Sequence, residues 1–210
     1  MQLRLQLSLS RCLLLQNLLV GLSLVVALAT PASGRETYRA LVVRMAQQVA
    51  RSHLERDDLE MQLFRLANAY RHSKGLGPLV FDRSAHDASV AHAMDMMARN
   101  YMGHNASTGQ DFGERMTALR DGAMVLPSMG ENAARLSHAD VNDPKAAQKI
   151  FEQWVNSSPH RHTLLSLDYL KLATGVVAQG DKIYADQIFV GPEVVTNMQR
   201  AVPQETGTLY

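Results

Sequence analysis

The stretch that decides the fold is LATGVVAQ-GD-KIYADQIFV, which runs from Leu172 to Val190. Both halves are rich in β-branched residues, a composition typical of strands. Gly180-Asp181 between them fits a two-residue hairpin turn with glycine in the first position. The sequence therefore predicts two antiparallel strands here, and a further strand is predicted from Met129 to Leu136.

The residues before this hairpin follow a helical rather than a strand period. From Leu59 to Tyr70 apolar residues recur at helical spacing, and Gly75 suits a left-handed C-terminal cap. In the last predicted helix Ile150 and Trp154 share the apolar face, so we expect Trp154 to anchor the core. Four helices are predicted. They begin near Leu59, at Asp82 or Ser84, near Asp111 and at Asp143-Pro144.

Helices around a small antiparallel sheet make a layered α+β domain. At 210 residues the chain has room for one domain and a tail. Its 21 Lys and Arg nearly balance its 20 Asp and Glu, so no overall field attracts nucleic acid. With 46% apolar and 20% charged residues, the composition is that of a soluble globular protein.

Residues 1–34 have the pattern of a secretory signal. Arg4 and Arg11 precede an apolar run from Leu18 to Ala29, and small residues follow it. This uninterrupted run is shorter than the roughly 20 residues that span a bilayer. Including the leucines at 13–15 lengthens it enough to leave an uncleaved N-terminal anchor as the alternative. Either way, the rest of the chain is expected outside the cytoplasm.

The only cysteine, Cys12, lies in this leader, so the exported domain is expected to fold without disulfides. Residues 35–58 carry a weak helical stripe and are interpreted as a linker or N-terminal helix outside the main fold. The domain itself is placed at residues 59–191, and residues 192–210 are interpreted as a C-terminal tail.

Three short polar clusters interrupt the apolar pattern where elements are predicted to end. They are Gly103-His104-Asn105, Gly130-Glu131-Asn132 and the run from Asn156 to Arg161. Binding and catalytic sites are usually assembled from polar residues that lie far apart in the sequence and converge in the fold.

Taken in order, these segments resemble the CAP superfamily: cysteine-rich secretory proteins, venom antigens, pathogenesis-related proteins and their bacterial SCP-like relatives. The resemblance covers about residues 60–191. The residues that carry it are Leu63-x-x-Leu66-Ala67-Asn68, Arg71, Gly75-Leu76-x-Pro78-Leu79, Ala85, His92-Ala93-x-Asp95-Met96, Tyr101-Met102-Gly103-His104, Phe112, Arg115, Gly130-Glu131-Asn132, Trp154, Asn156-Ser157, His160-Arg161, Gly175-Val176 and Gln187-Ile188-Phe189.

The resemblance implies an α-β-α sandwich with a surface cavity that His104 and Glu131 line. His160 matches the histidine of the bacterial Pro-Gly-His-Arg motif, although Ser158-Pro159 stands where Pro-Gly is usual and Thr163 where asparagine is usual. The eukaryotic His-Tyr-Thr-Gln motif and the eukaryotic disulfides have no counterpart.

Four further residues are assigned supporting roles. Asn132 and Asn156 belong to the polar clusters, and Arg161 is expected to anchor its segment through a carboxylate or carbonyl. Asp111 is expected to cap the third predicted helix, with a place on the cavity rim as the alternative. Among the other histidines, His162 is expected to face solvent, His92 to be a hydrogen-bonded core residue, and His86 to face outward.

Three classes of function stay open. The first is an exported binding module whose cavity takes a small molecule, a lipid or an envelope component. The second is a hydrolase: His104, Glu131 and His160 could hold Zn²⁺ or another divalent cation with an open position, or a histidine could activate Ser157 or Ser158. The third is an interaction protein in which the cluster only ties the fold together. Neither a His-Glu-x-x-His helix nor a Gly-x-Ser-x-Gly elbow is present.

Overall fold

The computed structural model describes residues 36–119 and 127–192; the proposed leader with Cys12 and the tail beyond residue 192 lie outside this range. Within it, no helix is long and apolar enough to cross a membrane. The elements, in chain order, are α1 (Tyr38–Ser52), α2 (Asp57–Ser73), β1 (Val80–Phe81), α3 (Arg83–Arg99), α4 (Phe112–Leu119), β2 (Met129–Ser137), α5 (Ala146–Asn156), α6 (Ser158–Leu165), β3 (Lys171–Gln179) and β4 (Lys182–Val190).

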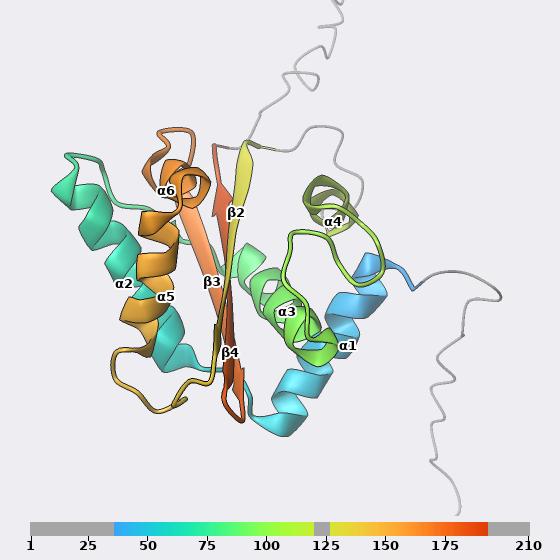
Figure 1. The fold of residues 1–210 in the computed structure, drawn as a ribbon. Coiled ribbons are helices and arrows are strands. Elements are labelled where there is room, and N and C mark those ends of the chain that lie inside the picture. The colour runs from blue at the N-terminus through green and yellow to red at the C-terminus, as the bar shows by residue number, and fades with distance from the viewer. Residues whose placement is uncertain (1–35, 120–126, 193–210) are drawn as a thin grey trace, which may run out of the picture. The chain divides into compact units, whose positions relative to one another are not determined.

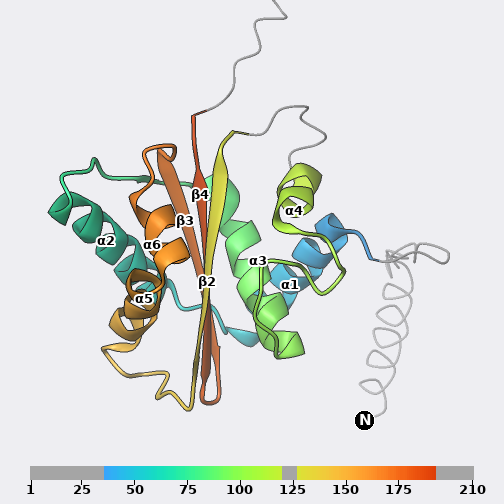
Figure 2. The ribbon, with the colours of Figure 1, turned by 45° about the horizontal axis from the view of Figure 1, so that its top comes forward.

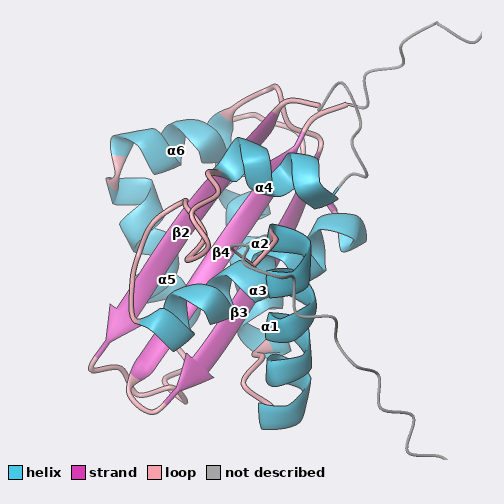
Figure 3. Ribbon diagram, turned by 90° about the vertical axis from the view of Figure 1, so that its right-hand side faces the viewer, coloured by secondary structure: helices cyan, strands magenta, loops and turns pink. Residues whose placement is uncertain are grey.

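The predicted hairpin forms the centre of a sheet with strand order β1-β3-β4-β2. Strands β3, β4 and β2 lie side by side in Figure 3. Gln179 pairs with Lys182, so Gly180 and Asp181 make the two-residue turn, and Gly180 has a φ of 60°. β2 pairs antiparallel with β4 along its whole length. The two-residue β1 joins β3 in parallel, so the sheet is antiparallel except at this edge.

Helices cover both faces of this sheet, which confirms the α+β sandwich. Helices α1, α3 and α4 lie on one side and α2, α5 and α6 on the other (Figures 1 and 2). Two apolar cores result, one on each face of the sheet. The alternation of side chains along a strand sends neighbouring residues into different cores: Tyr184 and Ile188 belong to the first, Ala185 and Phe189 to the second.

Helix α1 is part of the fold, which corrects the expectation that residues 35–58 lie outside it. Five of its residues, Tyr38, Leu41, Val42, Met45 and Val49, are buried in the first core. α1 packs against the side of α3 that faces away from the sheet (Figure 1). Residues 88–97 of α3 are therefore all buried, and they include Asp95, which the sequence pattern places on an outer face.

The other helix ends follow their capping residues. Asp82 is the N-cap of α3, and its Oδ1 accepts a hydrogen bond from the Ser84 backbone N–H at 2.9 Å. Helix α5 begins at Ala146, two residues after the predicted Pro144. The largest difference is α6: residues 158–165, for which no helix is predicted from the sequence, form a helix with proline in its first turn, a position that proline favours.

Trp154 is fully buried, as predicted, in the second core with Ile150 and Phe151. Its indole N–H donates to the carbonyl oxygen of Ala133 at 3.1 Å, which fastens α5 to β2.

We expect Trp154→Ala to lower the free energy of unfolding by roughly 3–5 kcal/mol, because truncating a buried aromatic loses apolar contacts and leaves a cavity. Denaturant unfolding measures the change. Leu167→Ala is the control, since Leu167 is 76% exposed and its loss should have little effect. Equal midpoints for the two variants would contradict the core role of Trp154.

The sheet and α3 approach most closely at Gly175. A Cβ atom there would lie 2.3 Å from the backbone N of Val90 and 2.5 Å from the carbonyl carbon of Ser89. Backbone atoms of a packed helix cannot move aside as a flexible side chain can, so β3 needs glycine at this position.

Gly175→Ala should therefore destabilise the protein by about 1–3 kcal/mol or more, as overpacked cores do. Gly77→Ala is the matched control, because a Cβ at Gly77 meets nothing within 4 Å. Thermal unfolding of both variants decides the matter, and an unchanged melting temperature for Gly175→Ala would show that α3 can shift away from the sheet.

Candidate functional site

Side chains of α3 hold the loop that carries His104 through hydrogen bonds. The helix ends in a left-handed Asn100, and the buried Asp95 then binds the loop that follows. Asp95 accepts hydrogen bonds from the Tyr101 hydroxyl at 2.7 Å, the Ser107 backbone N–H at 2.8 Å and the Ser107 hydroxyl at 2.6 Å. Nothing in the sequence pattern indicates this role of Asp95.

His92 supports the same loop. Its Nε2 lies 2.9 Å from the carbonyl oxygen of Gly103, the residue before His104. A carbonyl can only accept, so Nε2 carries the hydrogen. Burial, and then the charge of Arg115, lower the pKa of His92 to about 4, so this ring is neutral. The prediction of a hydrogen-bonded core histidine is confirmed.

Glu131 joins the predicted site to the interior. Its side chain, which is only 2% exposed, extends from β2 between His104 and Arg115. Oε2 lies 2.7 Å from His104 Nδ1, and Oε1 accepts a hydrogen bond from Arg115 Nη1 at 2.7 Å. Two of the three predicted site residues are thus in direct contact.

The charges in this group reinforce one another. Burial acts to raise the pKa of Glu131, but His104 and Arg115 outweigh it and the pKa is lowered. The hydrogen bond that the His104 ring donates to Glu131 in turn raises the pKa of His104, although partial burial of the ring opposes this. Both shifts favour an ion pair between a carboxylate and an imidazolium.

Arg115 is a residue of the candidate site for which the sequence alone predicts no role. It is completely buried, donates to the backbone carbonyl of His104 at 2.8 Å as well as to Glu131, and lies over the rings of Tyr38 and Phe112. Burial acts to lower its pKa, but the charge of Glu131 outweighs this and the pKa is raised. The only sequence signal for Arg115 was its place in the resemblance.

His160 lies near enough for the charge of His104 to act on it, but it forms no hydrogen bond to His104 or Glu131. It is half-buried on α6, and its backbone carbonyl accepts a hydrogen bond from the Asn132 side chain at 3.2 Å. Burial, and then the charge of His104, lower the pKa of His160. At neutral pH, therefore, the half-buried His160 is a neutral imidazole, while His104 favours the charged form.

The remaining predicted residues shape the backbone. Arg161 donates to the carbonyl of Val155 at 2.7 Å, the kind of anchor expected of it. Asp111 accepts from the Glu114 N–H at 2.8 Å while Glu114 accepts from the Asp111 N–H at 3.0 Å, a reciprocal capping box that starts α4. Asn156 is exposed at the end of α5, and His162 faces solvent as predicted.

A second acidic residue near Glu131, Asp186 on β4, is completely buried. Burial, and then the charge of Glu131, raise its pKa well above the usual value. His92, Glu131 and Asp186 each offer a ligand atom within 4.8 Å of the others, and so do Glu55, Glu60 and His86 elsewhere. Among the described residues these are the two groups in which three potential ligands lie this close together, and neither includes His104 or His160.

Comparison with known proteins assigns the family. Residues 64–192 match the cysteine-rich secretory protein family, CAP, over more than half of the chain. The chain belongs to the CAP family. The match includes the His104 loop, Arg115, Glu131 and His160, whereas Tyr38, which packs on Arg115, precedes it.

Similar bacterial proteins agree with this assignment. In Bacillus subtilis (strain 168) the chain is 32% identical over 131 residues to the uncharacterized membrane protein YlbC and 27% identical over 132 residues to the uncharacterized protein YkwD. These matches cover 62% and 63% of this chain but only 34% and 47% of the relatives.

The crystal structure of an extracellular protein with an SCP domain from Bacillus anthracis str. Ames has a TM-score of 0.51 and 29% identity to this chain. The match covers 65% of this chain and 41% of the Bacillus anthracis chain. The chain thus spans less than half the length of each of these three proteins.

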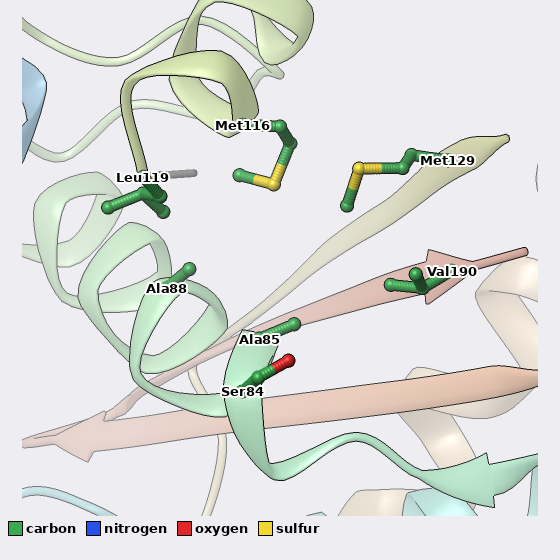
Figure 4. Close-up of a pocket in the computed structure, with 7 residues that line it drawn as sticks. All are labelled: Ser84, Ala85, Ala88, Met116, Leu119, Met129 and Val190. Carbon is green, nitrogen blue, oxygen red and sulfur yellow. The ribbon is translucent and has the colours of Figure 1, made fainter. Parts of the chain in front are cut away.

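An apolar pocket adjoins the cluster of His104, Glu131 and Arg115, but none of these three residues lines it. It has a volume of about 260 Å³ and lies between α3, α4 and the ends of β2 and β4 (Figure 4). Met116 and Met129 extend into it, each close in sequence to a residue of the buried ion pair. The lining residues are Ser84, Ala85, Ala88, Met116, Leu119, Met129 and Val190.

The contact between Glu131 and His104 predicts a pH effect. Replacing Glu131 by glutamine removes the negative charge, so the pKa of His104 should fall. An NMR titration of the His104 ring measures it, with the exposed His162 as internal control. An unchanged pKa would show that Glu131 does not set the charge of His104.

The same contact affects stability. Because the pKa of His104 is raised in the folded chain, the pair stabilises the fold below the ordinary histidine pKa of about 6.5, and this stabilisation is lost as the pH rises through the raised pKa. Glu131→Gln should remove this pH dependence from unfolding measurements.

Proposed function

We propose that this is an exported CAP domain that binds a divalent metal ion through the imidazoles of His104 and His160. The observation that carries the proposal is the 2.7 Å contact of Glu131 with Nδ1 of His104. It directs the other nitrogen, Nε2, away from the carboxylate on a ring whose side chain is 51% exposed. A carboxylate behind a histidine is the usual arrangement in metal sites, where it orients the ring and makes it a better ligand.

The contacts change the role expected of Glu131. Both of its oxygens are engaged by His104 and Arg115, and it is almost completely buried, so it orients the ligand rather than binding the ion. Two imidazoles leave other coordination positions for water or for a small ligand. Imidazole donors suit Zn²⁺ among the common divalent ions.

The two histidines should differ in how they accept an ion. His160 has a lowered pKa and offers a free lone pair at neutral pH, whereas His104 must first lose the proton that Glu131 stabilises. Binding should therefore release a proton and weaken in acid.

Export is supported by the leader pattern of residues 1–34 and by the similarity to an extracellular SCP-domain protein. The protein would act outside the cytoplasm, at the cell envelope or beyond it, on a small molecule, a lipid or an envelope component. Membrane attachment would come through the N-terminal segment if that segment is not removed.

A hydrolase has less support. Among the described residues, neither the Ser157 nor the Ser158 hydroxyl is hydrogen-bonded to a histidine, so no activated serine stands out. A metal-dependent hydrolase would need an ion-bound water at the same two imidazoles, and it therefore depends on the binding proposed here.

The test is a calorimetric titration with Zn²⁺ at about pH 7.5 and about pH 5.5, on either side of the usual histidine pKa. Wild type should bind more weakly at the lower pH. The His104→Ala, His160→Ala double variant should bind one ion fewer per chain, while His162→Ala should match wild type. Equal stoichiometry in wild type and the double variant would refute the metal site and favour an organic ligand instead.

A further inference from the structure

We propose that Glu55, Glu60 and His86 form a second divalent-metal site, at the opposite edge of the sheet from His104. Each contributes one ligand atom, and the three atoms lie within 4.8 Å of one another. The outer edge of β2 bears Glu131 and the first site, whereas this group lies against β3, the strand beyond β4. The proposal is independent of the function proposed above.

Three different elements bring these side chains together. Glu55 forms an isolated antiparallel bridge with Val177 of β3, Glu60 lies in the first turn of α2, and His86 lies in the first turn of α3. His86 does not face outward as its sequence position had suggested. Its ring is turned inward, with only 21% of the side chain exposed.

The imidazole nitrogen Nε2 is shared by both glutamates. It lies 2.8 Å from Oε2 of Glu60 and 3.7 Å from Oε1 of Glu55. Two ligands on one tetrahedral zinc, with bonds of about 2.1 Å, are separated by roughly 3.4 Å, which these two distances bracket. Small side-chain movements would therefore place one ion between the three atoms.

Two of the ligands are held in place by the fold. The second oxygen of Glu60, Oε1, accepts a hydrogen bond from the backbone N–H of Val176 at 2.9 Å. The ring of His86 contacts the ring of Phe81, with centroids 5.6 Å apart. Ligands fixed in this way lose little conformational entropy when they bind an ion.

The charge of the group is not balanced by the described residues. Glu60 is 4% exposed, yet neither it nor Glu55 forms an ion pair with lysine or arginine in the described part of the chain. A single imidazolium offsets only one of the two carboxylates, whereas a divalent ion bound to neutral His86 offsets both. Buried carboxylates are normally paired or bound to metal.

The exposure of the three ligands suits an ion that enters from solvent. Glu60 forms the buried floor, while the side chains of His86 and Glu55 are 21% and 33% exposed. One nitrogen and two carboxylate ligands, with open positions for water, suit Zn²⁺ or a similar first-row ion. Mg²⁺ prefers oxygen ligands alone and should bind poorly.

The experiment isolates this site in the full chain carrying His104→Ala and His160→Ala. Equilibrium dialysis with Zn²⁺ gives the stoichiometry, and thermal unfolding with and without Zn²⁺ gives a second readout, because an ion that binds the native state raises the melting temperature. We expect one bound Zn²⁺ per chain in this background and a higher melting temperature with the ion.

Two additional changes test the ligands. His86→Gln retains a donor for Glu60 but offers no imidazole, and Glu55→Gln removes one carboxylate; each should weaken binding at least about ten-fold. Asp87→Asn is the matched control, because it removes a neighbouring negative charge from a side chain that is 86% exposed and faces Nδ1 rather than Nε2. It should leave the affinity within about two-fold, as expected for a screened surface charge.

The outcomes separate the two sites. Loss of all Zn²⁺ binding in the double-alanine background would overturn this proposal and leave the first site intact. Retained binding after His86→Gln would also overturn it, since His86 would then only form an ion pair that ties α3 to α2. Binding that persists in the double variant and disappears with His86→Gln would establish the second site whatever the fate of the first.

Discussion

The buried pair of Arg115 and Glu131 is the constraint on which the site depends. Taking a guanidinium and a carboxylate out of water costs several kcal/mol for each ion, so each needs the other in place. Arg115 meets this need from α4 while also holding the carbonyl of His104, and the rings of Tyr38 and Phe112 shield it from water. One residue thus fixes α4, the His104 loop and β2 relative to one another, and α1 contributes through Tyr38.

This arrangement gives neighbouring groups opposite protonation preferences. The pKa of Glu131 is lowered and that of His104 raised, so a charged pair lies at the surface end of the cluster. Beneath it, His92 is neutral because its pKa is lowered, and the raised pKa of Asp186 favours its neutral acid form. A second buried negative charge next to Glu131 would compete for Arg115, so the preference of Asp186 for a proton protects the pair that orients His104.

Much of this could be predicted from sequence, and the failures have physical causes. The Gly180-Asp181 hairpin, the burial of Trp154 and the meeting of His104 with Glu131 follow from local pattern and from resemblance. Arg115 was missed because its partner is 16 residues away on another element, which no periodicity reveals. The place of α1 was missed because a weak stripe cannot show that α3 has a second buried side. Asp95 was missed for the same reason.

Both candidate sites follow from how the fold ends its sheet. An edge strand exposes unpaired backbone groups, and proteins cover them to prevent association. On β2, the indole of Trp154 and the amide of Gln153 bind the outward carbonyls of Ala133 and Arg135 at 3.1 and 3.2 Å. This brings α5, and with it α6 and His160, to that edge.

On β3 the carboxylate of Glu60 accepts a hydrogen bond from the N–H of Val176 in place of a strand partner. A carboxylate used in this way is buried with its charge, and His86 and Glu55 gather around it. Polar chemistry at both edges is therefore a consequence of covering the sheet, and metal binding would add function to groups that the fold already requires.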